Sequence, residues 1–405
     1  MLHVLRRLLC LLAITALALA APAVAAAPLS LRLTHALAVA HVDQREMGAI
    51  AIDLASGKVV FARNADLALA PASNEKLPLT YAALVRLGPS FRFRTEVLGE
   101  GTRVGHVWNG DIVLRGYGDP TLKTRGLIRL VAQLRAAGIR RVAGGVLGDE
   151  SHFDARRGVD GWKRSFYGDE CPALSALSIN RGVVKGIRIA DPALATAQRF
   201  RELLVNRGVS VAGAARVRPA ADGAVPLAAI TSAPLGEIVR LMDHDSDNYT
   251  AEMLLKELGA SAHGLGTSRG GALVVRETLA EAGVPLAGVR IVDGSGLSRS
   301  DRLTVRALAS ILRLAWTTPM VRAQLVRALP IAGKNGTLER RLRRGPARGL
   351  VRAKTGTTDL SSSLSGYVGK RYAFAVIHNG HPVWAWYARI AQDNFVQALA
   401  AAARS

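Results

Sequence analysis

A serine and a lysine three residues apart, Ser73 and Lys76, form the single Ser-x-x-Lys pattern of this chain. Side chains at this spacing lie on one face of a helix, so the lysine amine can reach the serine hydroxyl. A neutral amine there could take up the hydroxyl proton and make the serine a nucleophile. A helix N-cap is the alternative role for Ser73. Pro78 favours a helix start at this point, because proline is tolerated where backbone N–H groups lack intrahelical partners. A kink at Pro78 would instead separate the two side chains.

Lys354, Thr355, Gly356 and Thr357 form a second pattern, at the end of a run expected to be a β-strand. The lysine and the first threonine could hold a carboxylate through charge-assisted hydrogen bonds. The glycine lets a strand approach another element closely. The backbone N–H beyond the glycine could point at an oxyanion. A solvated lysine at a sheet edge is the alternative.

Two Ser-x-Asn segments could supply further polar side chains. Ser178 and Asn180 lie in an apolar run, where a structural role is expected. Ser246 and Asn248 follow a polar stretch and open a predicted helix, so their side chains would be exposed. We favour Ser246 and Asn248 on this context, with N-capping by Ser246 as the competing interpretation.

The elements that must position these groups include strands near both ends of the chain, with helices between them. Apolar and alternating runs predict strands at 48–54, 58–62, 289–292, 350–354, 364–368 and 372–378. Helical patterns and end signals predict helices at 29–42, 77–87, 235–242, 248–258, 304–316 and 383–402. This order indicates an α/β (α+β) fold in which the two ends of the chain close one sheet.

The middle of the chain has a different pattern of predicted secondary structure. Short strand-like runs and a helix between 94 and 147 form one strand–helix–strand unit, and 183–189, 193–206 and 209–217 form another. We therefore expect a discontinuous catalytic domain at 26–90 and 225–405. The inserted α+β region at 91–224 is expected to comprise two subdomains.

Residues 1–25 have the layout of a secretory signal peptide. Arg6 and Arg7 precede an apolar run that ends in small residues and is short for a membrane span. We expect an exported, periplasmic protein with no transmembrane span after signal removal. Cys171 would then be the only cysteine, which excludes an internal disulfide.

The composition is that of a globular protein, with 49% hydrophobic and 21% charged residues. The 53 basic and 31 acidic residues give a net charge of +22, which falls to +20 without the two signal-peptide arginines. Such a charge favours association with an anionic cell envelope. Scattered basic residues and only 5% aromatics argue against nucleic acid as a partner.

The three motifs together are the triplet of penicillin-binding proteins and class A β-lactamases. The chain more specifically resembles the class C low-molecular-mass penicillin-binding proteins, the D-Ala-D-Ala carboxypeptidase/endopeptidases of peptidase family S13. Matching flanks extend the resemblance over nearly the whole chain: Gly118–Leu122, Asp293–Arg299, Leu329–Gly333 and Gly336–Leu338. The resemblance implies a transpeptidase-like fold, an antiparallel sheet flanked by helices, with the insertion as a family trait.

The resemblance also implies roles for the first two motifs. Ser73 would attack the carbonyl of a D-Ala-D-Ala bond in a peptidoglycan stem peptide, and Lys76 would take up its proton. Ser246 would relay a proton to the leaving amine. Asn248 would bind the substrate amide and orient Lys76.

The third motif would bind the substrate. Lys354 and Thr355 would hold its terminal carboxylate, and Gly356 would permit the close approach. The backbone N–H groups of Ser73 and Thr357 would form the oxyanion hole. β-Lactams would be trapped as acyl-enzymes, and the resemblance implies no cofactor and no metal.

Three other functions compete with this one. A β-lactamase or an esterase could use the same fold, although the deacylating glutamate motif of class A β-lactamases is not evident. A non-catalytic scaffold that binds the cell wall is the competitor from another class, and the presence of every expected side chain argues against it. The balance between carboxypeptidase and endopeptidase activity does not follow from the sequence.

Overall fold

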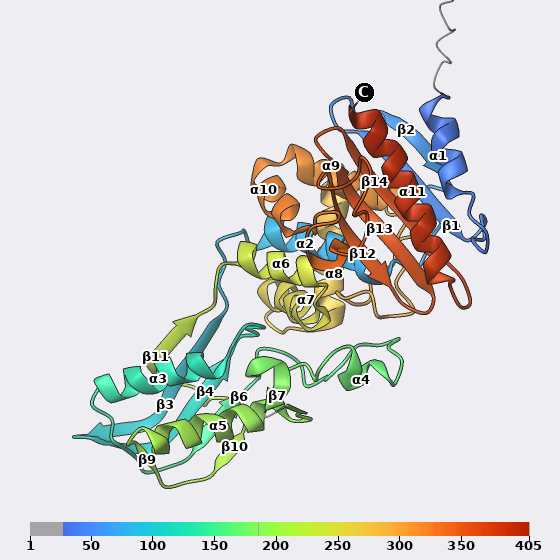
Figure 1. Cartoon of the computed structure of the whole chain (residues 1–405). Helices are drawn as coiled ribbons and strands as arrows, with labels where there is room; N and C mark the ends of the chain where they lie inside the picture. Colours follow the sequence, from blue (N-terminus) through green and yellow to red (C-terminus); the bar gives the residue numbers. More distant parts are fainter. Residues whose placement is uncertain (1–26, 185, 405) are drawn as a thin grey trace, which may run out of the picture.

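The computed structural model describes residues 27–184 and 186–404, so the expected signal peptide lies outside the described residues. Figure 1 shows a body, which contains both ends of the described chain, and a lobe formed by its middle part. The body holds a five-stranded sheet and the lobe a seven-stranded sheet. None of the helices in the described part of the chain is long and apolar enough to cross a membrane.

The sheet of the body joins the two ends of the chain. Its strands, in spatial order, are β12 (Val351–Thr357), β13 (Ser361–Val368), β14 (Tyr372–Asn379), β1 (Met47–Asp53) and β2 (Val59–Arg63). All neighbours are antiparallel, and β1 pairs with β14 along its whole length. The expectation that N- and C-terminal strands close one sheet is therefore confirmed.

Helices cover both faces of this sheet. Along β1, Ala49 and Ala51 belong to the core under two helices, α1 (Leu29–Leu37) and α11 (Ala385–Arg404). The alternate residues Ile50 and Ile52 belong to the core on the opposite face. The helices of that second core are α2 (Lys76–Arg86), α6 (Leu235–Asp245), α7 (Asn248–His263), α8 (Ser268–Glu281), α9 (Val305–Thr317) and α10 (Pro319–Ala328). The period-two alternation thus places apolar side chains in two separate cores.

The lobe has one sheet built from both expected strand–helix–strand units. Its strands are β3 (Arg94–Val104), β4 (Val107–Gly116), β5 (Arg141–Val142), β6 (Val146–Asp149), β9 (Ser210–Val211), β10 (Ala215–Val217) and β11 (Val225–Thr231). Two helices, α3 (Thr124–Ala136) and α5 (Pro192–Asn206), share its main core. The last strand, β11, pairs with β3, so the sheet extends seven residues past the boundary expected at 224.

Two expected strands are not part of either large sheet. The run 183–189 folds instead into two short strands, β7 (Val183–Val184) and β8 (Ile187–Arg188), which pair with each other. Gly186 has φ +79°, a turn conformation that interrupts a longer strand. The run 289–292 makes only an isolated bridge between Arg290 and Arg302, because the backbone N–H of Val292 donates to the side chain of Asp301.

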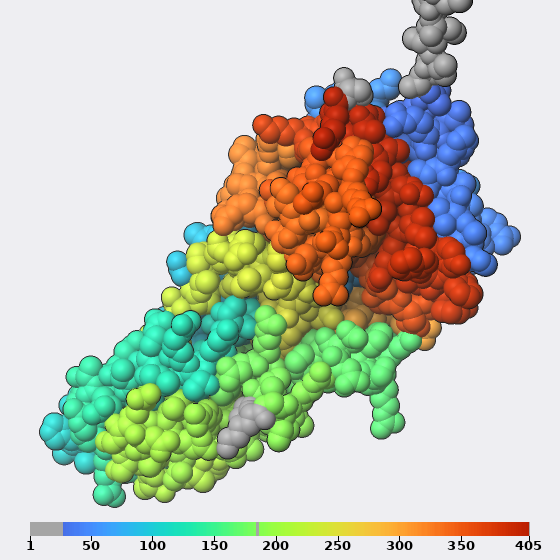
Figure 2. All heavy atoms as spheres, in the orientation of Figure 1, coloured from blue at the N-terminus to red at the C-terminus, as the bar shows by residue number. Residues whose placement is uncertain are grey.

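The lobe packs on the body through a long connecting segment that includes α4 (Phe166–Asp169). Figure 2 shows this part of the chain, in green, against the body. The contact is an apolar cluster that includes Phe153, Trp162 and Leu174 from the insertion with Tyr249 and Met253 from α7. Because α7 begins at Asn248, the insertion lies directly beside the motif formed by Ser246 and Asn248.

Candidate active site

Ser73 lies in a short 3₁₀ turn, Ala72–Glu75, and Lys76 begins helix α2 directly after it. Lys76 Nζ donates to Ser73 Oγ at 3.1 Å. Pro78 is the third residue of α2, where its missing N–H costs nothing, so it does not separate the two side chains. The N-cap of α2 is Glu75, and Ser73 makes no cap hydrogen bond to this helix.

Serines of β13 hold the turn that carries Ser73 (Ala72–Glu75) against the sheet. Ser363 Oγ donates to the Pro71 carbonyl at 2.7 Å, and Ser361 Oγ donates to the Ala70 carbonyl at 2.6 Å. Asn74 Nδ2 donates to Ser363 Oγ at 2.7 Å. Our sequence reasoning missed these groups. The signal was available in the alternate serines of a strand-like run, which must share one face of the sheet.

Gly356 permits a close contact between strand β12 and the turn that carries Ser73. A Cβ atom at this position would lie 2.8 Å from the Ser73 nitrogen and 2.3 Å from Ser363 Oγ. Any other residue would therefore force the strand and the turn apart. This geometry fits the close approach that the sequence led us to expect of this glycine.

The side chains of Ser246 and Lys354 are hydrogen-bonded to each other. Lys354 Nζ donates to Ser246 Oγ at 2.8 Å and to the Thr355 carbonyl at 2.8 Å. The Lys354 side chain is fully buried, so it is not a solvated lysine at a sheet edge. Ser246 does not cap α7 either, because Asp247 is the N-cap and accepts from the Thr250 N–H at 2.7 Å.

Lys76 Nζ has three hydrogen-bond partners, of which Ser73 is one. It also donates to Asn248 Oδ1 at 2.8 Å and to the carbonyl of Ser295 at 2.7 Å. A neutral amine has two hydrogens, and these two oxygens accept both. The lone pair of the amine then faces the Ser73 hydroxyl, which is the geometry a general base needs.

Ser295, whose carbonyl accepts a hydrogen bond from Lys76, is a further site residue that the sequence analysis did not identify. It belongs to the Asp293–Arg299 loop, noted only as a matching flank. Its backbone N–H and that of Gly294 donate to Glu252 Oε1 at 2.8 and 3.0 Å. Asp293 holds the same loop by accepting from the N–H groups of Gly296 and Ser298, each at 2.7 Å. The carbonyl that binds Lys76 is therefore fixed by two buried carboxylates.

Burial shifts the pKa values of both lysines toward neutrality. Burial lowers the pKa of Lys76, although the negative charges of Asp293 and Glu252 act in the opposite direction and raise it. Burial also lowers the pKa of Lys354 to about 7, and the positive charge of Lys76 adds to the effect. Burial and the nearby Asp293 charge raise the pKa of Glu252 to about 8. The site can therefore exchange protons near neutral pH.

A cleft of about 470 Å³ opens beside these groups. It is lined by Ser73, Glu170, Ser246, Asn248, Leu297, Thr337, Arg340, Arg341, Thr355, Gly356, Thr357, Thr358 and Arg389. Thr355 Oγ1 donates to Thr337 Oγ1 at 2.8 Å, and Arg389 Nη2 donates to Thr357 Oγ1 at 3.2 Å. The side chains of all three motifs thus meet around one cleft.

The rival Ser-x-Asn segment lies elsewhere. Asn180 Nδ2 donates to Thr124 Oγ1 at 3.2 Å within the lobe, and neither Ser178 nor Asn180 lines the cleft. Asn248, by contrast, contacts the insertion from within the site, since its Nδ2 donates to the Glu170 carbonyl at 3.1 Å. The connecting segment of the insertion therefore forms one wall of the cleft.

Such an arrangement suits acyl transfer. It offers a hydroxyl with an adjacent amine, a second hydroxyl bound to a second amine, and hydroxyl and cationic groups that can hold a carboxylate. A family model described as the D-Ala-D-Ala carboxypeptidase 3 (S13) family matches residues 29–186 and 175–402.

Individual proteins agree with the family match. A D-alanyl-D-alanine carboxypeptidase from Actinomadura sp. (strain R39) is 32% identical over 425 aligned residues, which cover 82% of this chain and 78% of that protein. The crystal structure of penicillin binding protein 4 from Haemophilus influenzae superposes with a TM-score of 0.81 at 22% identity, covering 92% of this chain and 98% of that one. The same protein complexed with a β-lactam gives a TM-score of 0.73 at 22% identity, with coverages of 90% and 97%. These superpositions confirm the expected penicillin-binding-protein fold.

Proposed function

The chain belongs to the D-Ala-D-Ala carboxypeptidase 3 (S13) family, and on this premise we propose that it is a serine D-Ala-D-Ala carboxypeptidase, a D,D-endopeptidase, or both, acting on peptidoglycan stem peptides. The observation that carries the proposal is the position of Lys76 Nζ, 3.1 Å from Ser73 Oγ, with Asn248 and Ser295 accepting its hydrogens. Ser73 is the proposed nucleophile and Lys76 the proposed base.

The first half-reaction forms an acyl-enzyme. Ser73 Oγ attacks the carbonyl carbon of the scissile bond, and its proton passes to Lys76. The oxyanion accepts hydrogen bonds from the backbone N–H groups of Ser73 and Thr357. The C–N bond then breaks, and Ser246 passes a proton to the leaving amine. The contact of Ser246 with Lys354 supports this relay, because the lysine can return the proton to the hydroxyl.

The second half-reaction releases the acyl group. Lys76 first releases the proton that it took from Ser73, which balances the proton that Lys354 supplied through Ser246 to the leaving amine, so both lysines return to their starting states. Water then replaces the departed amine and attacks the ester carbonyl, with a proton passing to Lys76. Lys76 gives this proton to Ser73 Oγ as the ester bond breaks, and the peptide leaves as a carboxylic acid, which ionises in water. Asn248, between Lys76 and the cleft wall, binds the substrate amide in this scheme, which its position in the cleft supports.

Lys354 and Thr355 are the proposed partners of the substrate's terminal carboxylate. The Thr355 hydroxyl lines the cleft and contacts Thr337, and the Lys354 amine lies behind the lining, bound to the cleft residue Ser246 and to the Thr355 carbonyl. A bound carboxylate raises the pKa of Lys354 and so keeps it charged. β-Lactams carry a comparable carboxylate, and we propose that they acylate Ser73.

The insertion and the export of the protein belong to the same proposal. The catalytic unit was expected at 26–90 and 225–405, but β11 (Val225–Thr231) belongs to the sheet of the insertion, so we place the second part of this unit after Thr231. The insertion contributes Glu170 to the cleft wall. Removal of a signal peptide at 1–25 would deliver the enzyme to the periplasm, where its substrate lies. The net charge of +22 favours association with the anionic envelope.

Two substrates offered side by side test the function. One is a peptide that ends in D-Ala-D-Ala, and the other is a cross-linked muropeptide. Release of D-alanine establishes carboxypeptidase activity, and separation of the cross-linked strands establishes endopeptidase activity. Failure with both, together with rapid turnover of penicillin, would identify a β-lactamase instead. Failure with both and no penicillin labelling would identify a scaffold.

A further inference from the structure

Two exposed tryptophans lie at the start of helix α11, beside the cleft. Trp384 is 61% exposed and Trp386 is 71% exposed. Trp386 is three residues before Arg389 on the helix, so both side chains share one helical face. Arg389 donates to Thr357 and lines the cleft. Trp386 therefore lies on the helical face that Arg389 presents to the cleft, whereas Trp384, two residues earlier, lines a separate cavity.

Neighbouring rings support Trp384. The centroid of the His41 ring lies 5.5 Å from that of Trp384 and 4.6 Å from that of Tyr387. Trp384 and Tyr387 also meet edge to face at 6.4 Å. Three rings in mutual contact hold one another in place, so Trp384 offers a supported apolar face to solvent.

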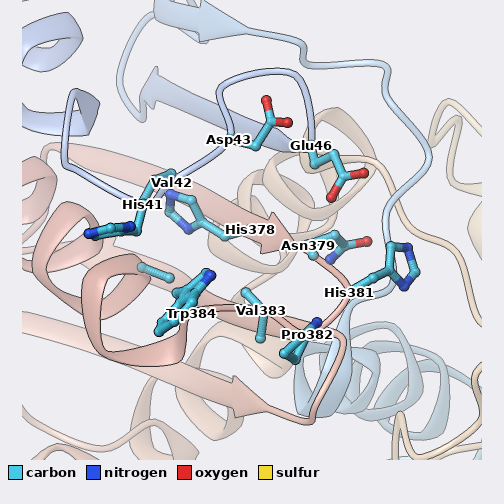
Figure 3. A pocket seen from close by; sticks show the side chains of 12 residues that line it. His41, Val42, Asp43, Glu46, His378, Asn379, His381, Pro382, Val383 and Trp384 are labelled. Atoms are coloured by element: carbon cyan, nitrogen blue, oxygen red, sulfur yellow. The ribbon is translucent and has the colours of Figure 1, made fainter.

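A second cavity, of about 480 Å³, lies next to these rings. Figure 3 shows it between the segment that carries His41, Asp43 and Glu46 and the segment that carries His381 and Trp384. Of the two carboxylates that line the cavity, Asp43 is paired with Arg45 at 3.0 Å, whereas Glu46 has no ion pair with any described residue. Aromatic faces and hydrogen-bond acceptors thus line one space.

His378 adds a hydrogen-bond donor to the wall of this cavity. Gln392 Nε2 can only donate, so His378 Nδ1 accepts at 3.4 Å and the neutral ring carries its proton on Nε2. Burial keeps the ring neutral, because it lowers the pKa of His378 to about 4. Nε2 is buried and has no hydrogen-bond partner in the described residues. An unpartnered buried donor of this kind is expected to gain an acceptor from a bound molecule.

We propose that Trp386, Trp384 and the cavity beside His41 form a saccharide-binding surface for the glycan strand of peptidoglycan, a polymer of N-acetylated amino sugars. Sugar rings have apolar C–H faces that stack on tryptophan. Their hydroxyl groups donate to carboxylates such as Glu46, and an acetamido carbonyl can accept from His378. The surface rests on the proposed function, because it would hold the glycan while its stem peptide occupies the cleft.

Charge favours a glycan over a membrane at this surface. Exposed tryptophans also occur at lipid interfaces, and the net charge of +22 would suit anionic lipids. However, Asp43 and Glu46 line the same cavity, and carboxylates are repelled by an anionic lipid surface. The sugar rings of a glycan strand present hydroxyl and acetamido groups, and the lactyl carboxyl groups on alternate sugars are uncharged where they are amide-linked to stem peptides, so the strand meets less repulsion than an anionic lipid surface.

Binding of peptide-free glycan strands to the Ser73→Ala protein tests the proposal by titration calorimetry. This protein cannot form an acyl-enzyme, so the result does not depend on whether the proposed peptidase activity exists. Trp384→Ala and Trp386→Ala, added singly, should each weaken glycan binding at least about fivefold. Met320→Ala, which removes another exposed apolar side chain, should leave it unchanged. The thermal unfolding midpoint of each variant reports on its fold.

The outcomes separate the possible partners. Loss of glycan binding in both tryptophan variants, with unchanged thermal unfolding, supports the saccharide surface. Absence of glycan binding by the Ser73→Ala protein overturns it, as does unchanged binding in the tryptophan variants. Binding to phosphatidylglycerol vesicles that depends on the same tryptophans, without glycan binding, overturns it in favour of a membrane surface.

Discussion

The carbonyl oxygen of Ser295 accepts a hydrogen bond from Lys76 Nζ at 2.7 Å. This contact joins the Ser-x-x-Lys pair to a loop more than 200 residues away in sequence. Together with Asn248 it accepts both hydrogens of a neutral Lys76 amine, whose lone pair would then face Ser73. The orientation of the proposed base therefore depends on a backbone carbonyl, whose position depends in turn on Glu252 and Asp293.

Replacement of Glu252 should weaken the base without touching substrate. In Glu252→Ala the N–H groups of Gly294 and Ser295 lose their acceptor, so the Ser295 carbonyl can move away from Lys76. A displacement of about 1 Å can cost roughly a hundredfold in rate. We expect the acylation rate with penicillin to fall by about tenfold to a hundredfold, with a smaller change in KM for a D-Ala-D-Ala peptide.

The conservative variant Glu252→Gln is the matched control. Its amide oxygen can accept the same two N–H groups, so it should restore most of the acylation rate. It also removes the charge that Glu252 carries above its pKa of about 8, and this charge raises the pKa of Lys76. Any shift of the acylation rate to lower pH in this variant should therefore appear only above about pH 8. Equal rates in all three proteins would exclude a positioning role for Glu252.

Removal of the Lys76 amine should abolish most acylation. Lys76→Met keeps the apolar stem but leaves Ser73 without a base, and a general base contributes about 10² to 10⁴ in rate. The exposed Lys58→Met variant controls for the loss of one positive charge. Stopped-flow measurement with a chromogenic β-lactam gives the rates. A wild-type rate in Lys76→Met would assign the base to another group.

The pH dependence should reveal Lys354. Its pKa of about 7 lies below the ordinary lysine value, so it carries a charge below about pH 7 and loses it above. We expect kcat/KM for a peptide with a free terminal carboxylate to fall above this pH. The same peptide with a terminal amide should be a poor substrate and lack this decline. A parallel decline for both peptides would mean that Lys354 does not hold the carboxylate.

Gly356→Ala should damage the site through packing alone. The added methyl group would meet the Ser73 nitrogen and Ser363 Oγ, and the strand or the turn that carries Ser73 must move. We expect a large loss of penicillin labelling and a lower thermal unfolding midpoint. A crystal structure of the variant would show the displacement. Normal labelling would mean that the turn tolerates it.

Sequence reasoning reached the parts of the site that are carried by short, distinctive motifs. Ser73 with Lys76, and Lys354 with Gly356, could be identified because their spacing limits what they can contact. The terminal strands were also predictable, since runs such as β14 are apolar over most of their length, in β14 up to Ile377, and must be buried. The assignment of Ser246 over Ser178 required only local context.

Contacts between distant segments could not be predicted in this way. The role of Ser295 depends on a backbone carbonyl, which leaves no trace in residue type. Glu252 resembles any charged residue of an amphipathic helix until its burial in α7 is known. The pairing of β11 with β3 depends on register across more than 100 residues, so the end of the insertion was placed too early for its sheet.

The mass of the intact protein after exposure to penicillin G shows whether Ser73 is the nucleophile. The wild-type protein should gain the mass of one penicillin molecule, and the Ser73→Ala protein should gain none while keeping the same thermal unfolding midpoint. Peptide mapping should place the adduct on Ser73. An adduct that persists in the Ser73→Ala protein would contradict the assignment of the nucleophile.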